Sequence, residues 1–198
     1  MYPLVETIRI IEGIPQNLFW HQGRFEHSYE KLFRTQPKLK VEEALLISRE
    51  YKRGNVKARF LYNKDSHACN YSRSIPIKIK SLKLIVDNDI DYSLKYTDRK
   101  RIVNLLEMKD DCDDILIVKN RRVTDSSIAN IVFYDGRAWY TPLLPLLRGT
   151  CRERLISEGK IIPEEIMIED LGLFSKFKLI NAMNDFEEQE DIDISEIK

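Results

Sequence analysis

The chain has 198 residues, of which 43% are hydrophobic and 32% charged, so it can build a core in one large or two small domains. Its 32 basic and 32 acidic residues balance, which argues against a protein that coats nucleic-acid phosphates. Three scattered cysteines disfavour a disulfide framework. No basic stretch precedes an apolar one at the start, and no apolar run approaches the roughly 18 residues of a membrane span. We therefore expect a cytoplasmic protein that binds neither nucleic acid nor membrane.

The first half of the sequence predicts one strand, two helices and then antiparallel strands. Apolar residues favour a strand over Val5–Ile11, and helical spacing favours helices over 18–34 and Val41–Tyr51. The period then changes to two, because apolar residues alternate with polar ones over 56–62 and again over 75–79.

A polar stretch over 86–91, read as a linker, separates this half from the next, where strands and helices alternate without a strict βαβ order. An Asp135-Gly136 pair is typical of a hairpin turn, and Gly159 is typical of a helix end. The predicted elements are a helix over Arg99–Met108, a strand over Asp114–Val118, a hairpin of Ile128–Phe133 with Ala138–Tyr140, a helix over Thr150–Glu158, a short helix or extended piece over Glu164–Asp170 and a strand over Phe177–Ile180.

These elements predict a mixed α and β protein in two lobes. We place a small α/β lobe at residues 1–90 and a larger lobe at 91–186. The last 14 residues hold seven acids and one Lys, so we expect residues 187–198 to form a solvated acidic tail.

Several familiar sites are disfavoured. His67 and Cys69 are one residue apart but lack a second pair of ligands, so no metal is expected. His21 and His27 are expected at the surface or at its boundary. The sequence has no G-x-S-x-G elbow, no P-loop and no G-x-G-x-x-G, which disfavours a serine hydrolase and the common nucleotide-binding folds.

Five segments, taken together and in order, resemble the class IV pyridoxal-phosphate enzymes, which include branched-chain and D-amino-acid aminotransferases and aminodeoxychorismate lyase. The segments are WHQGRFEHS (20–28), YSLKYTDRK (92–100), RRVTDSSIANIVF (121–133), WYTPLLPLLRGTCRERL (139–155) and KLINAMNDF (178–186). The resemblance implies an α+β protein of fold type IV, like D-amino-acid aminotransferase, with a small α/β lobe and a larger barrel-like lobe. It also implies a homodimer, pyridoxal 5'-phosphate as cofactor and a small amino-bearing substrate.

The resemblance assigns the central chemistry to Lys95 and Asp125. Lys95 would form an imine with the cofactor and, once released, would carry a proton as general base and then acid. Asp125 stands where the family usually has Glu and would keep the pyridine nitrogen protonated. The residues alone leave other interpretations open: Lys95 as a surface lysine and Asp125 as a turn cap before Ser126.

The phosphate would be held by a helix start and an arginine. Thr150 and Cys151, within Gly149–Arg152, would present backbone N–H groups, and Arg24 would supply a cationic fork. Plain N-capping by Thr150 and a solvated Arg24 are the alternatives. Asn181 and Ala182 would form a second turn near the phosphate or the substrate carboxylate, or simply a turn at a strand end. We expect a structural role for Arg99.

The INAM sequence at 180–183 looks most like the lyase branch of that family, so elimination that releases pyruvate and 4-aminobenzoate is the first hypothesis. A class IV aminotransferase is the second. A protein that binds the cofactor without catalysis is the third, because Asp125 replaces Glu and the expected first strand begins almost at Met1.

Overall fold

The computed structural model describes residues 1–75 and 77–198. Two compact units divide the chain: one holds residues 1–76 and 94–98, the other residues 77–93 and 99–198. The chain thus leaves the first unit, returns to it for five residues and leaves again.

The first unit contains an antiparallel sheet in the order β2-β1-β3-β4. Its strands are β1 (Leu4–Ile11), β2 (Ile14–Pro15), β3 (Asn55–Tyr62) and β4 (His67–Arg73). Alternate residues of β3 face a buried core, which confirms the period-two interpretation of 56–62, and β1 confirms the strand predicted over Val5–Ile11.

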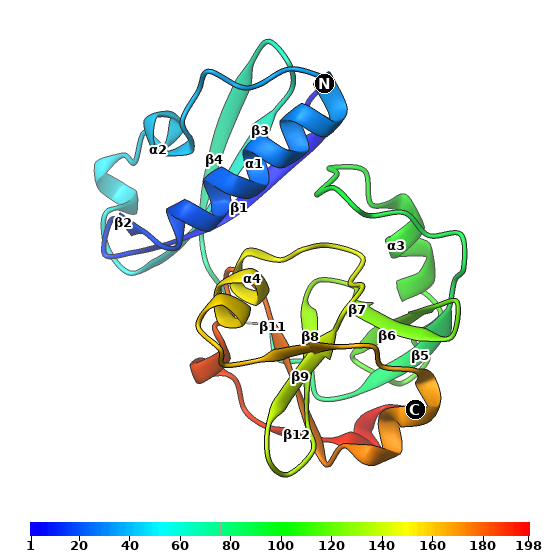
Figure 1. Cartoon of the computed structure of the whole chain (residues 1–198). Helices are drawn as coiled ribbons and strands as arrows, with labels where there is room; N and C mark the ends of the chain where they lie inside the picture. Colours follow the sequence, from blue (N-terminus) through cyan, green and yellow to red (C-terminus); the bar gives the residue numbers. More distant parts are fainter. Residues whose placement is uncertain (76) are drawn as a thin grey trace. The chain divides into compact units, whose positions relative to one another are not determined.

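Helix α1 (Leu18–Phe33) covers this sheet, as Figure 1 shows, and confirms the helix predicted over 18–34. The helix predicted over Val41–Tyr51 is wrong: the structure has a single turn, α2 (Val41–Ala44), and a 3-10 turn, η1 (Arg49–Tyr51). Between them Leu45 and Ile47 point toward the core while Leu46 is exposed. That alternation has a period of two, so the segment is extended rather than helical.

The second unit contains a sheet in the order β10-β9-β8-β7-β6-β5, with β11 paired to β8 and β12 to β11. The pairs β5–β6 and β9–β10 are parallel, and the other pairs are antiparallel. The strands are β5 (Leu82–Val86), β6 (Asp114–Lys119), β7 (Arg122–Ser126), β8 (Asn130–Tyr134), β9 (Trp139–Pro142), β10 (Ile162–Glu164), β11 (Lys176–Ile180) and β12 (Ile192–Asp193). The helical segments are α3 (Lys100–Leu106), α4 (Thr150–Ser157) and the 3-10 turns η2 (Ile168–Leu173), η3 (Phe186–Glu188) and η4 (Ile194–Glu196).

Most predictions for this unit are confirmed. The helix over Arg99–Met108, the strand over Asp114–Val118, the β8–β9 hairpin and the strand over Phe177–Ile180 are present with small shifts of their ends. Helix α4 gives way to Gly159, whose φ of 68° is the left-handed conformation that glycine adopts readily. Strands β5, β7, β10 and β12 of this unit, and β4 of the first unit, were not predicted from the sequence.

The strand predicted over 75–79 is not supported. Pro76 lies outside the described residues, and residues 77–81 belong to no strand. Ile75 and Ile77 are largely exposed, so the alternation of isoleucines does not mark a face that packs on a core.

Residues 187–198 are folded, which corrects the expectation of a solvated tail. Strand β12 pairs with β11, and the N–H of Lys198 donates to the carbonyl of Leu82. Ile192, Ile194 and Ile197 pack against the apolar cluster of the second unit. Because an isoleucine recurs every two or three residues among the acids, the segment can bury one side and leave its carboxylates outside.

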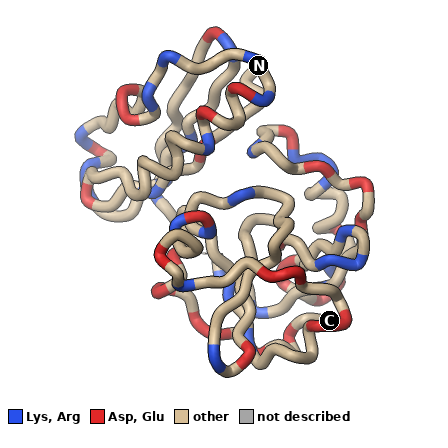
Figure 2. Tube along the Cα trace, viewed as in Figure 1, with Lys and Arg blue, Asp and Glu red and all other residues tan. Residues whose placement is uncertain are grey.

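Basic and acidic residues are interspersed along the trace of each unit (Figure 2), in line with the balanced composition. Within the described part of the chain, no helix is long and apolar enough to cross a membrane.

Candidate functional site

The Asp125 carboxylate is buried in the second unit, at the end of β7. The Nδ2 of Asn130 donates to Asp125 Oδ1 at 2.8 Å, and the N–H of Leu147 donates to Oδ2 at 2.9 Å. The turn that follows is capped instead by Ser126, whose Oγ accepts from the N–H of Ala129 at 3.1 Å. Asp125 therefore does not serve as the turn cap that its position before Ser126 allowed.

Burial raises the pKa of the Asp125 carboxyl to about 6, although the hydrogen bonds from Leu147 and Asn130 and the charge of Arg152 oppose the rise. A carboxyl with such a pKa changes its protonation close to neutrality. It is suited to bind a protonated ring nitrogen, because a positive charge beside Asp125, in addition to that of Arg152, would stabilise the ionised carboxylate.

Asn130 is a residue that our sequence analysis did not single out, although it lies in the quoted IANIVF segment. It begins β8 and pairs with Asp125 of β7 on one side and with Ile180 of β11 on the other. Its Nδ2 also donates to the carbonyl of Leu147 at 2.8 Å. The one usable signal was an amide side chain within an otherwise apolar strand, which requires hydrogen-bond partners once buried.

The start of α4 fits an anion such as a phosphate. Gly149 is the N-cap residue, so Thr150 does not cap the helix by its side chain. The Thr150 Oγ1 is buried and has no hydrogen-bond partner among the described residues. An orphaned hydroxyl beside the first N–H groups of a helix, which include that of Cys151, is an arrangement that a phosphate satisfies.

A turn follows β11 and is held by Asn181. The Oδ1 of Asn181 accepts from the N–H groups of Met183 at 2.8 Å and Asn184 at 3.0 Å. Its Nδ2 donates to the carbonyl of Ile128 at 3.3 Å. Ala182 lies within this turn, two residues after the end of β11, whose Ile180 pairs with Asn130. Asn181 is thus built into the turn through its own side chain.

Lys95 belongs to the first unit through the short segment Leu94–Asp98. The N–H of Val5 donates to the carbonyl of Lys95 at 3.0 Å, and the N–H of Thr97 donates to the carbonyl of Pro3 at 2.9 Å. These backbone bonds fix the segment against the start of β1, so the position of the Lys95 backbone is set by the sheet.

Arg24 lies in the same unit and is not a solvated helix residue. Its Nε donates to Glu6 Oε1 at 2.8 Å and its Nη2 to Glu6 Oε2 at 2.6 Å. The fully buried Glu6 also accepts from the Nδ1 of His21 at 2.6 Å. His21 is itself fully buried, which corrects its expected place at the surface.

The charges in this trio are set by burial and by pairing. Burial would raise the pKa of Glu6, but the charge of Arg24 and hydrogen bonds from His21 and Arg24 lower it to about 2. Burial also lowers the pKa of His21, although the hydrogen bond to Glu6 and the negative charge of Glu6 act to raise it. A neutral His21 therefore donates through Nδ1–H, and its Nε2 has no partner in the described part of the chain.

The structure thus gathers the candidate residues in two groups, each within one unit. Asp125, Thr150, Cys151, Asn181 and Ala182 belong to the second unit, and Lys95 and Arg24 to the first. Arg99 of the second unit donates through Nη2 to the carbonyl of Ser127 at 2.6 Å, the structural kind of role expected of it. In the described residues, no cluster of three or more His, Cys, Asp or Glu side chains could hold a metal ion.

Comparison with known proteins gives one family. The profile described as "Amino-transferase class IV" matches residues 3–186. An uncharacterized protein of Haemophilus influenzae is 38% identical over 186 residues, covering 93% of this chain and 99% of the relative. A crystal structure of a candidate 4-amino-4-deoxychorismate lyase of Haemophilus somnus 129PT is 36% identical, with a TM-score of 0.87 over 94% of this chain and 98% of that one.

A more distant crystal structure, of an aminotransferase of Brucella abortus bound to pyridoxal phosphate, is 15% identical. It covers 96% of this chain and 79% of that one with a TM-score of 0.74, so it supports the fold. The fold predicted from the resemblance, α+β and fold type IV, is confirmed.

The first prediction concerns the proton of Asp125. Its folded pKa of about 6 lies above the ordinary 3.8, so its protonation stabilises the fold fully below pH 3.8 and no longer does so above about pH 6. The unfolding free energy of the wild-type apoprotein minus that of Asp125→Asn should therefore fall between pH 4 and pH 7, by on the order of 3 kcal/mol. Urea titrations at each pH measure this difference.

Asp135→Asn is the matched control. Hydrogen bonds from the N–H groups of Ala138 and Arg137 lower the pKa of the exposed Asp135, so its difference should change in the opposite direction with pH. A flat profile for Asp125→Asn would contradict the buried environment described for Asp125.

The second prediction concerns Glu6. Its folded pKa of about 2 lies below the ordinary 4.5, so its ionised form stabilises the fold above pH 4.5, and this contribution is lost as the pH falls toward 2. Glu6→Gln should cost about 3 kcal/mol at pH 7, because it removes one partner of a buried ion pair, and less at pH 3. Glu30→Gln, an exposed change on α1, should shift stability by less than about 0.5 kcal/mol. Equal losses for Glu6→Gln at both pH values would refute the assignment.

Proposed function

Because the chain belongs to the amino-transferase class IV family, whose members bind pyridoxal phosphate, we propose that it is a pyridoxal-phosphate enzyme that acts as a homodimer on an amino-bearing acid. The reaction that we propose is the elimination that converts 4-amino-4-deoxychorismate to 4-aminobenzoate and pyruvate. The observation that carries this choice is the 36% identity, over nearly the whole of both chains, to the candidate lyase of Haemophilus somnus.

We expect residues of the second unit to bind both the ring nitrogen and the phosphate of this cofactor. Asp125 would hold the proton of the ring nitrogen, because its buried carboxylate is stabilised by a nearby positive charge. The first N–H groups of α4 and the orphaned Thr150 hydroxyl would bind the phosphate, assisted by the turn at Asn181 and Ala182.

The first unit would supply the amine and a cation. When bound, pyridoxal phosphate supplies an aldehyde for a lysine amine and a ring that withdraws electrons from a substrate carbon. The Nζ of Lys95 would bind that aldehyde and, once displaced by the substrate amine, would take a proton from the substrate and return one. Arg24 would supply a cation for the phosphate, while its two hydrogen bonds to Glu6 hold the plane of its guanidinium in place.

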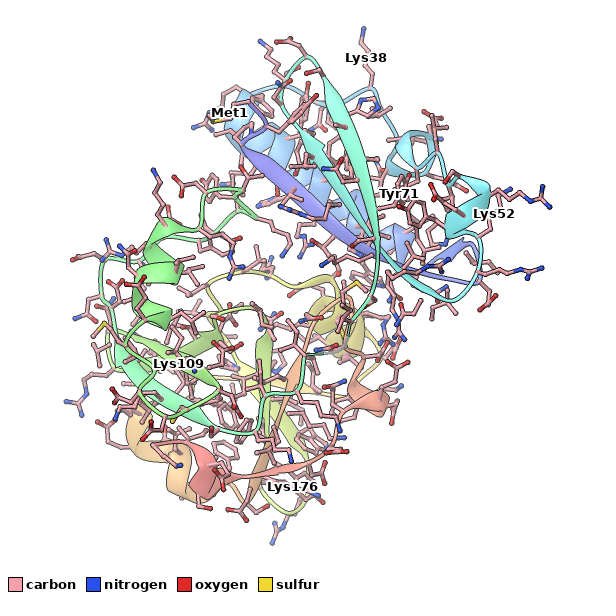
Figure 3. All side chains as sticks on the ribbon, turned by 180° about the vertical axis from the view of Figure 1, so that it is seen from behind. Met1, Lys38, Lys52, Tyr71, Lys109 and Lys176 are labelled. Atoms are coloured by element: carbon pink, nitrogen blue, oxygen red, sulfur yellow. The ribbon has the colours of Figure 1, made fainter. Side chains whose placement is uncertain are left out.

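The third prediction tests the lysine. Borohydride reduction of the protein incubated with pyridoxal phosphate should fix the cofactor on the peptide that contains Lys95, since reduction makes the lysine–cofactor bond irreversible. Mass spectrometry of a proteolytic digest locates the label. In Lys95→Ala the label should disappear, whereas it should persist in Lys38→Ala, whose exposed side chain extends away from the ribbon (Figure 3). A label on another lysine in the wild type would remove Lys95 from the site.

The fourth prediction tests the reaction. With 4-amino-4-deoxychorismate the wild-type protein should release pyruvate, detected with lactate dehydrogenase, and 4-aminobenzoate, detected by its fluorescence, in equal amounts. Lys95→Ala should lose at least about 100-fold in rate, the lower range for general acid–base catalysis, while Lys38→Ala should keep the wild-type rate.

Two other outcomes of this assay would redirect the proposal. Amino-group transfer to a keto acid faster than pyruvate release would make the protein an aminotransferase of the same fold. Loading of Lys95 without turnover on a panel of amino acids would leave a cofactor-binding protein, for which the shorter Asp125 in place of Glu gives a physical reason.

A further inference from the structure

Three segments that carry candidate site residues meet at Asn130. In the sheet of the second unit, Asn130 lies opposite Asp125 of β7 and opposite Ile180 of β11, the residue before the Asn181 turn. The third segment is the approach to α4, because the Asn130 amide contacts both Leu147 and Gly149. Asn130 itself is buried.

The amide of Asn130 has a fixed orientation. Its Nδ2 donates to Asp125 Oδ1 and to the carbonyl of Leu147, both at 2.8 Å. A flipped amide would place an oxygen against these two acceptors, so only one orientation is allowed. The N–H of Leu147 donates in turn to Asp125 Oδ2 at 2.9 Å, which closes a ring of carboxylate, amide and backbone.

Gly149 lies against the oxygen of the Asn130 amide, on the side opposite its Nδ2. A Cβ built on Gly149 would lie 1.9 Å from Asn130 Oδ1, far inside van der Waals contact. The backbone that leads into α4 therefore runs directly against the amide, and only glycine permits this approach. A change in the position of the Asn130 amide would therefore displace the first residues of α4, and the reverse.

We infer that Asn130 is a positioning residue that holds the Asp125 carboxylate and the start of α4 in one fixed arrangement. It stabilises the ionised Asp125 by donating to it, together with the N–H of Leu147, and Arg152 of α4 is the charged group that acts on Asp125 from the helix. The consequence for catalysis rests on the proposed function, whereas the coupling itself is a property of the apoprotein.

The experiment measures the Asp125 carboxyl directly. The full-length apoprotein is labelled with 13C-aspartate and titrated by NMR from pH 4 to pH 8, and Asp125→Asn assigns the resonance. In Asn130→Ala the pKa of Asp125 should rise by at least about one unit, because the ionised form loses a hydrogen-bond donor. Loss of packing alone would not produce such a shift.

A second variant reaches the same contact from the other side. Gly149→Ala leaves Asn130 in place but displaces its amide, so the pKa of Asp125 should rise in the same direction. It also keeps the test valid if Asn130→Ala does not fold. The matched controls are Gly172→Ala, where an added Cβ meets nothing within 4 Å, and Asn104→Ala on the exposed side of α3. Both should leave the titration of Asp125 unchanged.

The outcomes separate this inference from the proposed function. If the pKa of Asp125 in the folded variants stays within about 0.3 units of the wild-type value, well below the shift expected from losing a donor, Asn130 does not position Asp125. If the pKa moves as expected but borohydride labels no lysine in the wild type, the positioning role stands and the proposed function fails. If both hold, cofactor affinity measured by fluorescence at about pH 5 should fall about tenfold in Asn130→Ala, because a carboxyl whose pKa has risen by one unit is ionised about tenfold less at a pH below both pKa values.

Discussion

The hydrogen bond from Asn130 to Asp125 is the contact on which the site in the second unit depends. A carboxylate that is fully removed from water must either take up a proton or find donors, and here the donors are one side-chain amide and one backbone N–H. Both come from segments that are held elsewhere, the amide by β8 and the N–H by the loop before α4. The carboxylate therefore cannot change its position without moving a strand or a helix start.

The two units bury a carboxylate by opposite means. Glu6 faces a guanidinium that donates two hydrogen bonds, and its pKa falls to about 2, so it is ionised at every pH at which the protein is expected to work. Asp125 has neutral donors with one more distant cation, and its pKa rises to about 6. The negative charge of Glu6 is neutralised by Arg24 in the same unit, whereas Asp125 can still stabilise a further positive charge. That difference separates a structural ion pair from a residue available for chemistry.

The elements with strong periodicity could be predicted from sequence, and so could the family. The strand at Val5–Ile11, the helix at 18–34 and the hairpin at Asp135-Gly136 each follow from a local pattern that the core then uses. Where the prediction failed, the deciding partner was distant in sequence. The isoleucines at 75 and 77 do not face a core, and the isoleucines of the C-terminal segment do, although both sets have similar spacing.

In the candidate site, too, contacts between residues distant in sequence could not be predicted. Lys95, Asp125, Thr150 and Arg24 could be selected because the motifs resemble a family, and the structure adds what each contacts. Neither the pairing of Arg24 with Glu6 nor the role of Asn130 could be selected, because both depend on which side chains are enclosed together. A glutamate in a predicted strand carries no local signal of burial, and the apolar neighbours of Asn130 indicate that it is buried but not which carboxylate its amide contacts.

The path of the chain has a consequence for how the protein is made. The first unit needs residues 94–98, which follow seventeen residues that belong to the second unit. During synthesis the sheet of β1 to β4 can form early, yet its last segment emerges from the ribosome only after β5 has begun the other unit. No single proteolytic cut separates the two units intact, since cleavage near residue 76 leaves the lysine-bearing segment on the wrong fragment. We therefore expect that neither unit can be produced as a complete fragment by cutting the chain at one place.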